Sequence, residues 1–125
     1  MNLSPLTAVS PIDGRYYNQT KHLSSYFSEF ALIRYRLIVE VEYFIMLSEK
    51  KFFKADTRLK NKLRQLADQF TIEDAMLIKD TEAITNHDVK AVEYFLKNKL
   101  DEYGAGNLKE WVHFGLTSQD INNTA

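Results

Sequence analysis

No glycine or proline occurs between Gly14 and Gly104 in this chain of 125 residues. Gly and Pro are the residues that most strongly end helices and mark turns. A strand-rich domain of this length would need many turns built from such residues, and the long stretch contains neither of them. The sequence therefore predicts an all-α fold.

The composition removes several classes of protein from consideration. Sixteen Lys and Arg residues oppose 17 Asp and Glu residues, a net charge of −1, whereas a nucleic-acid-binding domain usually has a basic excess. The absence of cysteine excludes a disulfide framework, a thiol nucleophile and a Cys-ligated metal. The longest apolar run, residues 43–47, is too short to span a bilayer, and the first residues lack the features of a signal peptide. We expect a single cytoplasmic domain over residues 1–125 that binds neither nucleic acid nor a membrane.

One stretch of the chain carries apolar residues at helical spacing. They recur at steps of three and four, which places them on one face of a helix, and Arg36 and Glu40 fall between them. The residues of this stripe are Leu23, Tyr26, Phe27, Phe30, Ile33, Leu37, Val41, Phe44 and Ile45. We expect the stripe to pack in the core. A surface for a partner is the alternative, because Leu32, Ile38 and Val39 make the helix apolar on further sides.

Capping residues mark where the helices begin. Ser, Thr and Asp side chains accept hydrogen bonds from the free N–H groups of a first helical turn, and several of them precede helical patterns here. We expect helices to begin at or next to Ser28, Asp56, Thr71, Asp88 and Thr117. Residues 101–109, with two glycines, are expected to form a loop, and Trp111, Val112 and Phe114 to mark a short helix.

Three polar segments interrupt the helical pattern, and the first covers residues 10–17 (Ser-Pro-Ile-Asp-Gly-Arg-Tyr-Tyr). Its Pro-x-Asp-Gly sequence is typical of a tight turn, which would project Arg15 and Tyr16 from a fixed base. A guanidinium held in this way suits a phosphate or a carboxylate. A simple N-terminal turn with a surface Arg is the alternative.

The other two segments lie where loops meet helices. Asn86, His87 and Asp88 form one of them, and free N–H groups at a helix start favour an anion while His can transfer protons near neutral pH. The other, residues 113–120 (His-Phe-Gly-Leu-Thr-Ser-Gln-Asp), offers the hydroxyls of Thr117 and Ser118 to a ligand. Capping alone would explain both segments. The three histidines lie far apart in the sequence, so no metal site is expected.

Taken together, the three segments closely resemble the adenylosuccinate lyase family in its bacterial form, within the aspartase/fumarase superfamily. The matching residues are 10–16, then 85–94 (Thr-Asn-His-Asp-Val-Lys-Ala-Val-Glu-Tyr), then 113–123, which ends in Asp-Ile-Asn-Asn. The likeness covers almost the whole chain, in order and with similar spacing. It implies the N-terminal helical domain of that superfamily, with residues near 117–125 beginning the central domain and with the central helical-bundle and C-terminal domains absent.

The resemblance also implies an activity. Members of the family cleave a C–N bond by β-elimination in purine biosynthesis: adenylosuccinate gives AMP and fumarate, and succinylaminoimidazole carboxamide ribotide (SAICAR) gives the carboxamide ribotide (AICAR) and fumarate. They use no metal or organic cofactor, and they are homotetramers. The expected partners are therefore the nucleotide substrate and further copies of the chain.

By the same resemblance, the substrate-binding residues are Arg15, Tyr16, Asn86, His87, Asp88, Thr117 and Ser118. Arg15 would lie near the nucleotide phosphate, and His87 would play an auxiliary catalytic role. Thr117 and Ser118 would hold the succinyl part of the substrate, with His113 close to the same site.

The family's general-acid His and general-base Ser lie in segments that this sequence does not contain. We therefore expect little or no activity from the chain alone. Another lyase of the superfamily, such as argininosuccinate lyase, is one alternative, although the first two polar segments point away from it. A helical interaction module without catalytic function is the other alternative, and it would leave the three polar segments as coincidence.

Overall fold

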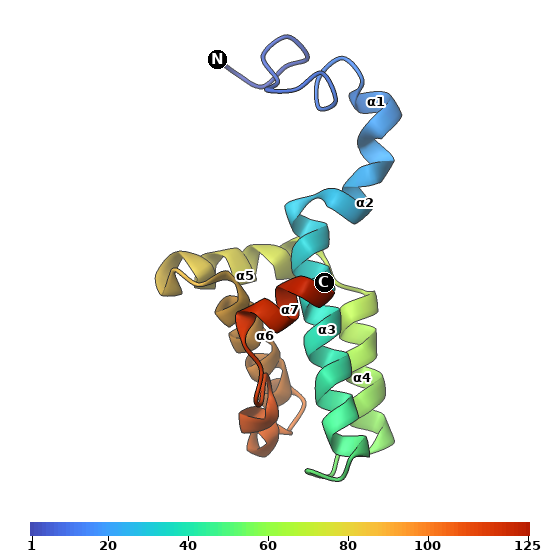
Figure 1. The fold of residues 1–125 in the computed structure, drawn as a ribbon, viewed down its shortest axis with the longest axis vertical. Helices are drawn as coiled ribbons and strands as arrows, with labels where there is room; N and C mark the ends of the chain where they lie inside the picture. Colours follow the sequence, from blue (N-terminus) through green and yellow to red (C-terminus); the bar gives the residue numbers. More distant parts are fainter. The chain divides into compact units, whose positions relative to one another are not determined.

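The computed structural model describes residues 1–125, and its regular elements are all helices (Figure 1), which confirms the predicted fold class. The chain divides into two compact units, residues 1–32 and 33–125, with the boundary inside α3. The elements are α1 (Tyr17–Thr20), η1 (Lys21–Leu23), α2 (Ser24–Phe27), α3 (Glu29–Glu49), α4 (Thr57–Asp68), α5 (Ile72–Thr85), α6 (Asp88–Glu102), η2 (Gly106–Trp111) and α7 (Ser118–Thr124). None of these helices combines the length and the apolar character that crossing a membrane requires.

The first unit consists of turns followed by three short helical segments. The side chains of Leu23, Tyr26 and Phe27 are exposed, that of Phe27 at 84%, so the prediction that they belong to the core is wrong. Ser28 provides the physical reason, because its extended backbone (ψ 165°) ends α2 and interrupts the helical phase before α3 begins. The apolar stripe is therefore divided among η1, α2 and α3, and its buried positions, from Ile33 onward, all lie on α3.

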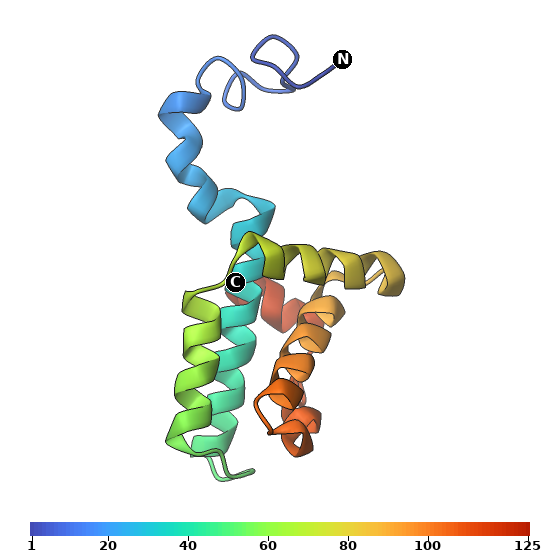
Figure 2. The same cartoon turned by 180° about the vertical axis from the view of Figure 1, so that it is seen from behind.

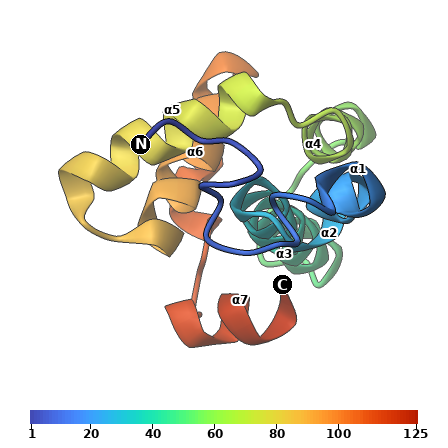
Figure 3. The same cartoon turned by 90° about the horizontal axis from the view of Figure 1, so that it is seen from above.

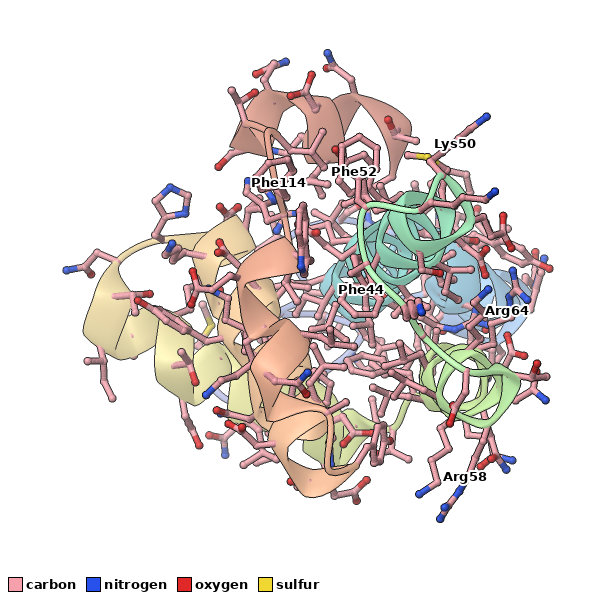
Figure 4. The ribbon with its side chains drawn as sticks, turned by 90° about the horizontal axis from the view of Figure 1, so that it is seen from below. Phe44, Lys50, Phe52, Arg58, Arg64 and Phe114 are labelled. Atoms are coloured by element: carbon pink, nitrogen blue, oxygen red, sulfur yellow. The ribbon has the colours of Figure 1, made fainter.

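In the second unit, α3 and α4 run side by side in opposite directions (Figures 1 and 2). Glu42 on α3 accepts two hydrogen bonds from the guanidinium of Arg64 on α4, at 2.9 and 3.0 Å. In the last turn of α4, the carbonyl oxygen of Ala67 accepts a hydrogen bond from Arg34 Nε at 3.4 Å. Figure 4 shows Arg58 pointing outward from α4. Because Arg64 and Glu42 are both half exposed, their pair fixes the register of the helices more than it stabilises them.

The core of the second unit draws side chains from every α-helix in it. Fully buried members are Leu37, Phe44, Leu63, Ile78, Leu96, Leu100 and Ile121. The stripe positions from residue 33 onward are all buried, as predicted. An aromatic cluster extends the core past the end of α3: the Phe44 and Phe53 rings lie 4.7 Å apart, and Trp111 stacks on Phe53 at 5.5 Å. Phe52 and Phe114 face each other at its edge (Figure 4), with ring centroids 6.5 Å apart.

Most of the predicted helix starts are confirmed. Ser28 Oγ accepts the N–H of Ala31 at 3.1 Å, and Asp56 Oδ1 accepts the N–H of Leu59 at 2.8 Å. Thr71 opens α5 through reciprocal hydrogen bonds with the residue three positions on. These side chains satisfy N–H groups that would otherwise have no partner in the first helical turn.

The prediction for residues 101–114 is partly wrong. α6 continues to Glu102, and a 3₁₀ helix occupies Gly106–Trp111 in place of the second half of the expected loop. The expected short helix at Trp111 and beyond does not form, because Val112 is extended (ψ 130°) and His113 is left-handed (φ 59°). This tight turn leads the chain from η2 into α7.

Candidate functional site

The first group of candidate residues, Arg15 and Tyr16, follows the tight turn of the first unit. The carbonyl oxygen of Pro11 accepts N–H groups from Gly14 and Tyr16 at 3.3 and 2.9 Å. Glycine is required in this turn, because a Cβ at Gly14 would lie 2.6 Å from the carbonyl oxygen of Pro5. Both candidate side chains are exposed, and the Arg15 guanidinium lies 4.6 Å from the centre of the Tyr16 ring while donating to its hydroxyl at 2.9 Å. The two side chains thus hold each other, and the guanidinium keeps donors for an anion.

The second group lies at the junction of α5 and α6. Asn86 ends α5 in the left-handed conformation (φ 52°), and its N–H donates to Glu82 O at 2.8 Å. His87, and not Asp88 as predicted, is the N-cap of α6, and its Nδ1 accepts the N–H of Lys90 at 3.2 Å. Because Nδ1 is an acceptor, the proton of the neutral ring is on Nε2. The exposed ring therefore presents a hydrogen-bond donor to a ligand.

Asp88 does not cap α6 because its carboxylate has other partners. Its Oδ2 lies 2.9 Å from Arg36 Nη2 on α3, and its Oδ1 accepts the N–H of Val89 at 2.8 Å. Partial burial opposes ionisation of Asp88, but the Val89 N–H and the Arg36 guanidinium outweigh it and lower the pKa of the carboxyl. Arg36 Nε also donates to Asn122 Oδ1 on α7 at 2.9 Å. One guanidinium therefore connects α3 with the starts of α6 and α7.

Thr117 and Ser118 begin α7, which lies on the opposite side of α3 from α4 (Figure 3). The backbone N–H and the hydroxyl of Thr117 both donate to Asp120 Oδ2, at 2.8 and 3.0 Å. These two hydrogen bonds lower the pKa of Asp120. The Thr117 side chain is exposed and that of Ser118 is half-buried, so both hydroxyls remain accessible at the helix start.

His113, close before this helix, is anchored to α3. Its Nδ1 lies 2.5 Å from Oε1 of Glu40, a side chain with no exposed surface. The other carboxyl oxygen, Oε2, is buried without a hydrogen-bond partner. Burial raises the pKa of Glu40, and the hydrogen bond with His113 opposes only part of that rise. In the same turn, the carbonyl oxygen of Phe114 accepts the hydroxyl of Tyr43 at 2.6 Å.

The structure brings part of the predicted site together. Asn86 and Asp88 line a polar hollow of about 430 Å³ at the α5–α6 junction, together with Lys79, Glu82 and Ala83. Through Arg36, Asp88 is tied to the helix that begins at Ser118. Arg15 and Tyr16 belong to the first unit. No group of three or more His, Asp and Glu side chains is arranged to hold a metal ion.

Sequence reasoning missed Arg36 and Glu40, which organise the second unit. Both were placed only between the apolar positions of the stripe, yet they are 8% and 0% exposed. A sequence signal was available, because two opposite charges four residues apart inside an apolar stripe lie on the same side of a helix. Their partners, however, lie about 50 to 90 residues further on, and the pattern of one helix cannot identify them.

Comparisons with known proteins agree with the predicted resemblance. A family model described as "Lyase" matches residues 14–125. The chain is 52% identical over its whole length to the adenylosuccinate lyase of Dictyostelium discoideum, of which it covers 28%. It is 48% identical over its whole length to that of Vibrio cholerae serotype O1, again covering 28%. To that of Escherichia coli K12 it is 45% identical, over 98% of this chain and 28% of the relative. The chain thus spans 28% of the length of these curated relatives.

Proposed function

The chain belongs to the lyase family, in the N-terminal region of the aspartase/fumarase superfamily, and on that premise we propose that it is the substrate-binding N-terminal part of an adenylosuccinate lyase. The observation that carries the proposal is the match of the whole chain to several enzymes of that name at 44–52% identity. In the proposed reaction, adenylosuccinate is cleaved to AMP and fumarate, and SAICAR to AICAR and fumarate. Both steps belong to purine biosynthesis in the cytoplasm.

The local geometry supports a binding role for each group of residues. The substrate carries a phosphate and two carboxylates, so its recognition needs donors and cations. Arg15 offers a guanidinium for the phosphate, pre-oriented by the Tyr16 ring and the rigid turn before it. His87 offers its Nε2–H at the start of α6, and the hydroxyls of Thr117 and Ser118 lie at the start of α7.

Asp88 has a different part in the proposal. Its carboxylate is already paired with Arg36 and would repel an anionic ligand, so we assign it to holding the α5–α6 junction while Asn86 and His87 contact the substrate. The Arg36–Asp88 ion pair fixes the start of α6, and the Lys90 N–H, which donates to Nδ1, keeps the His87 ring in one orientation. His87 is then an auxiliary catalytic residue that stabilises charge developing on the substrate as the C–N bond breaks.

The proposed enzyme needs more than this chain. We assign the principal general acid and general base to segments outside these 125 residues, and we propose a homotetramer as the working form. A purified chain of residues 1–125 should therefore release no substantial fumarate from adenylosuccinate. Turnover by this chain at the rate of the longer enzyme would contradict the assignment.

The decisive assay uses the longer protein that carries this chain, with adenylosuccinate as substrate. We expect His87→Gln to lower kcat/KM by at least about tenfold, because Gln retains an acceptor for the Lys90 N–H but, unlike an imidazole, cannot take up a proton or carry a charge. His22→Gln is the matched control, because His22 is an exposed residue of the first unit and we expect no change from it. Arg15→Met should raise KM, with the outward-pointing Arg58→Met as its control (Figure 4).

The same enzyme, offered argininosuccinate as a second substrate, separates the alternatives. Cleavage of argininosuccinate alone would replace the proposed substrate with that of another superfamily lyase. An interaction module would instead use the apolar hollow of about 430 Å³ between α3 and α7, whose lining includes Ile38, Val39 and Leu116. In that case His87→Gln and Arg15→Met would leave lyase activity unchanged, which would contradict the proposed function.

A further inference from the structure

Glu40 is a fully buried carboxyl group that is not among the residues assigned to the proposed site. It lies in the middle of α3, and its Oε1 contacts Nδ1 of His113 at 2.5 Å. Its Oε2 is buried without a partner, and the neighbouring buried acid, Glu93, is already paired with Lys90 and Lys97 on its own helix. A buried carboxyl group is costly to keep, so a position that retains one calls for an explanation.

The turn that Glu40 holds has an unusual backbone. His113 is left-handed (φ 59°) and Gly115 is left-handed as well (φ 73°), and a non-glycine residue adopts this conformation only when its surroundings impose it. Two contacts from α3 impose it here: the Glu40–His113 pair and the hydrogen bond from the Tyr43 hydroxyl to Phe114 O at 2.6 Å. The two anchors act one turn before Thr117, where α7 begins.

The contact also decides which ring nitrogen of His113 a ligand can meet. A proton lies between Nδ1 and Oε1 whether the imidazole or the carboxyl group carries it, so Nδ1 always faces Glu40. The His113 side chain is 14% exposed, and Nε2 is the ring nitrogen that remains for a ligand. In His87 the backbone N–H of Lys90 occupies Nδ1, so Nε2 again remains free. The two rings are therefore held by different partners, His113 by a carboxyl group and His87 by a backbone N–H.

We propose that Glu40 is a positioning residue for the proposed lyase site: by holding His113 through Nδ1 it orients Nε2 and sets the turn that presents Thr117 and Ser118. This inference rests on the proposed function for its effect on catalysis, but its structural part is independent of it. Glu40 touches no substrate and acts only through His113. Tyr43 supports the same turn through the backbone.

The structural part is tested by NMR on this chain labelled with ¹⁵N-histidine. The sequence contains only three histidines, and His22 and His87 are exposed and serve as internal references. We expect one low-field proton, protected from exchange with solvent, in the hydrogen bond between His113 Nδ1 and Glu40 Oε1. Glu40→Gln should shift this resonance strongly, and Glu42→Gln, a matched change on the exposed side of α3, should not. Three histidines with the same spectrum, in a folded or an unfolded chain, would overturn the proposal.

The catalytic part is tested with Glu40→Gln in the longer enzyme. We expect kcat/KM to fall by at least about tenfold, mainly through KM, because the displaced turn carries binding groups. Loss of folded enzyme alone would lower kcat and leave KM unchanged, and that result would overturn the positioning role. Glu42→Gln should retain wild-type values. An inactive wild-type enzyme would contradict the proposed function and leave the NMR result to decide the role of Glu40.

Discussion

The ion pair between Arg36 and Asp88 predicts an unequal response to removal of its two partners. The Arg36 side chain is 10% exposed, and that of Asp88 is 46% exposed. Removal of Asp88 leaves a nearly buried guanidinium with Asn122 as its remaining partner, whereas removal of Arg36 leaves a carboxylate that water can reach. An uncompensated buried charge costs far more than a rehydrated one.

The magnitudes follow from these exposures. Asp88→Ala should destabilise the chain by about 3 kcal/mol. An uncompensated buried charge costs about 3–5 kcal/mol, and the partial exposure of Arg36 reduces this cost. Loss of an acidic residue from the first turn of α6 adds up to about 1 kcal/mol. Arg36→Met should cost only about 1 kcal/mol, because Met fills the space of the aliphatic stem and Asp88 regains water. The double variant should lie near 2 kcal/mol, less destabilised than Asp88→Ala alone.

The assay is urea unfolding of the chain and its three variants, followed by the helical circular dichroism signal. The midpoint and slope of each curve give the free energy of unfolding. The expected signature is that adding Arg36→Met to the Asp88→Ala variant restores stability. Equal single-variant effects that simply add would show that Arg36 does not depend on this carboxylate, and the reasoning would be refuted.

Three further predictions concern other parts of the chain. The pKa of Glu40 is raised above its ordinary value of 4.5, so its contribution to stability falls as the pH rises through the raised value. In unfolding curves, the stability difference between wild type and Glu40→Gln should therefore shrink above pH 4.5. Phe44→Ala should cost about 3–5 kcal/mol in the same assay and Phe27→Ala less than about 0.5 kcal/mol, since the first ring is 0% and the second 84% exposed. Asn86→Gly should keep the stability of the chain, because glycine accepts the left-handed backbone, yet it should raise the KM of the longer enzyme. A stability loss above about 1 kcal/mol would contradict this account of the α5–α6 junction.

The helix starts were predictable because their signals are local. Asp56 and Thr71 each lie directly before a helical pattern, and their side chains bond N–H groups only three residues away. A capping interaction therefore leaves its full signature within one short segment. The three polar segments were found for the same reason, since each lies at a turn or a helix start.

The exceptions arise where distant parts of the chain compete for the same group. Asp88 has the residue type of an N-cap, but Arg36, 52 positions earlier, takes its carboxylate and His87 caps the helix instead. The hydrogen-bond partner of the buried Glu40 is His113, 73 positions later. Phe27 was misplaced for the opposite reason: it fits the helical spacing, but the first unit offers no surface that covers it.

A chimeric enzyme tests the central claim most directly. The chain would replace the matching region of the Escherichia coli relative, to which it is 45% identical over 98% of its length, and fumarate release from adenylosuccinate would be measured. We predict that the chimera cleaves adenylosuccinate and that Arg15→Met within it raises KM severalfold or abolishes turnover. A folded chimera without turnover, or one that Arg15→Met leaves unchanged, would contradict the claim that this chain supplies the substrate-binding part of the enzyme.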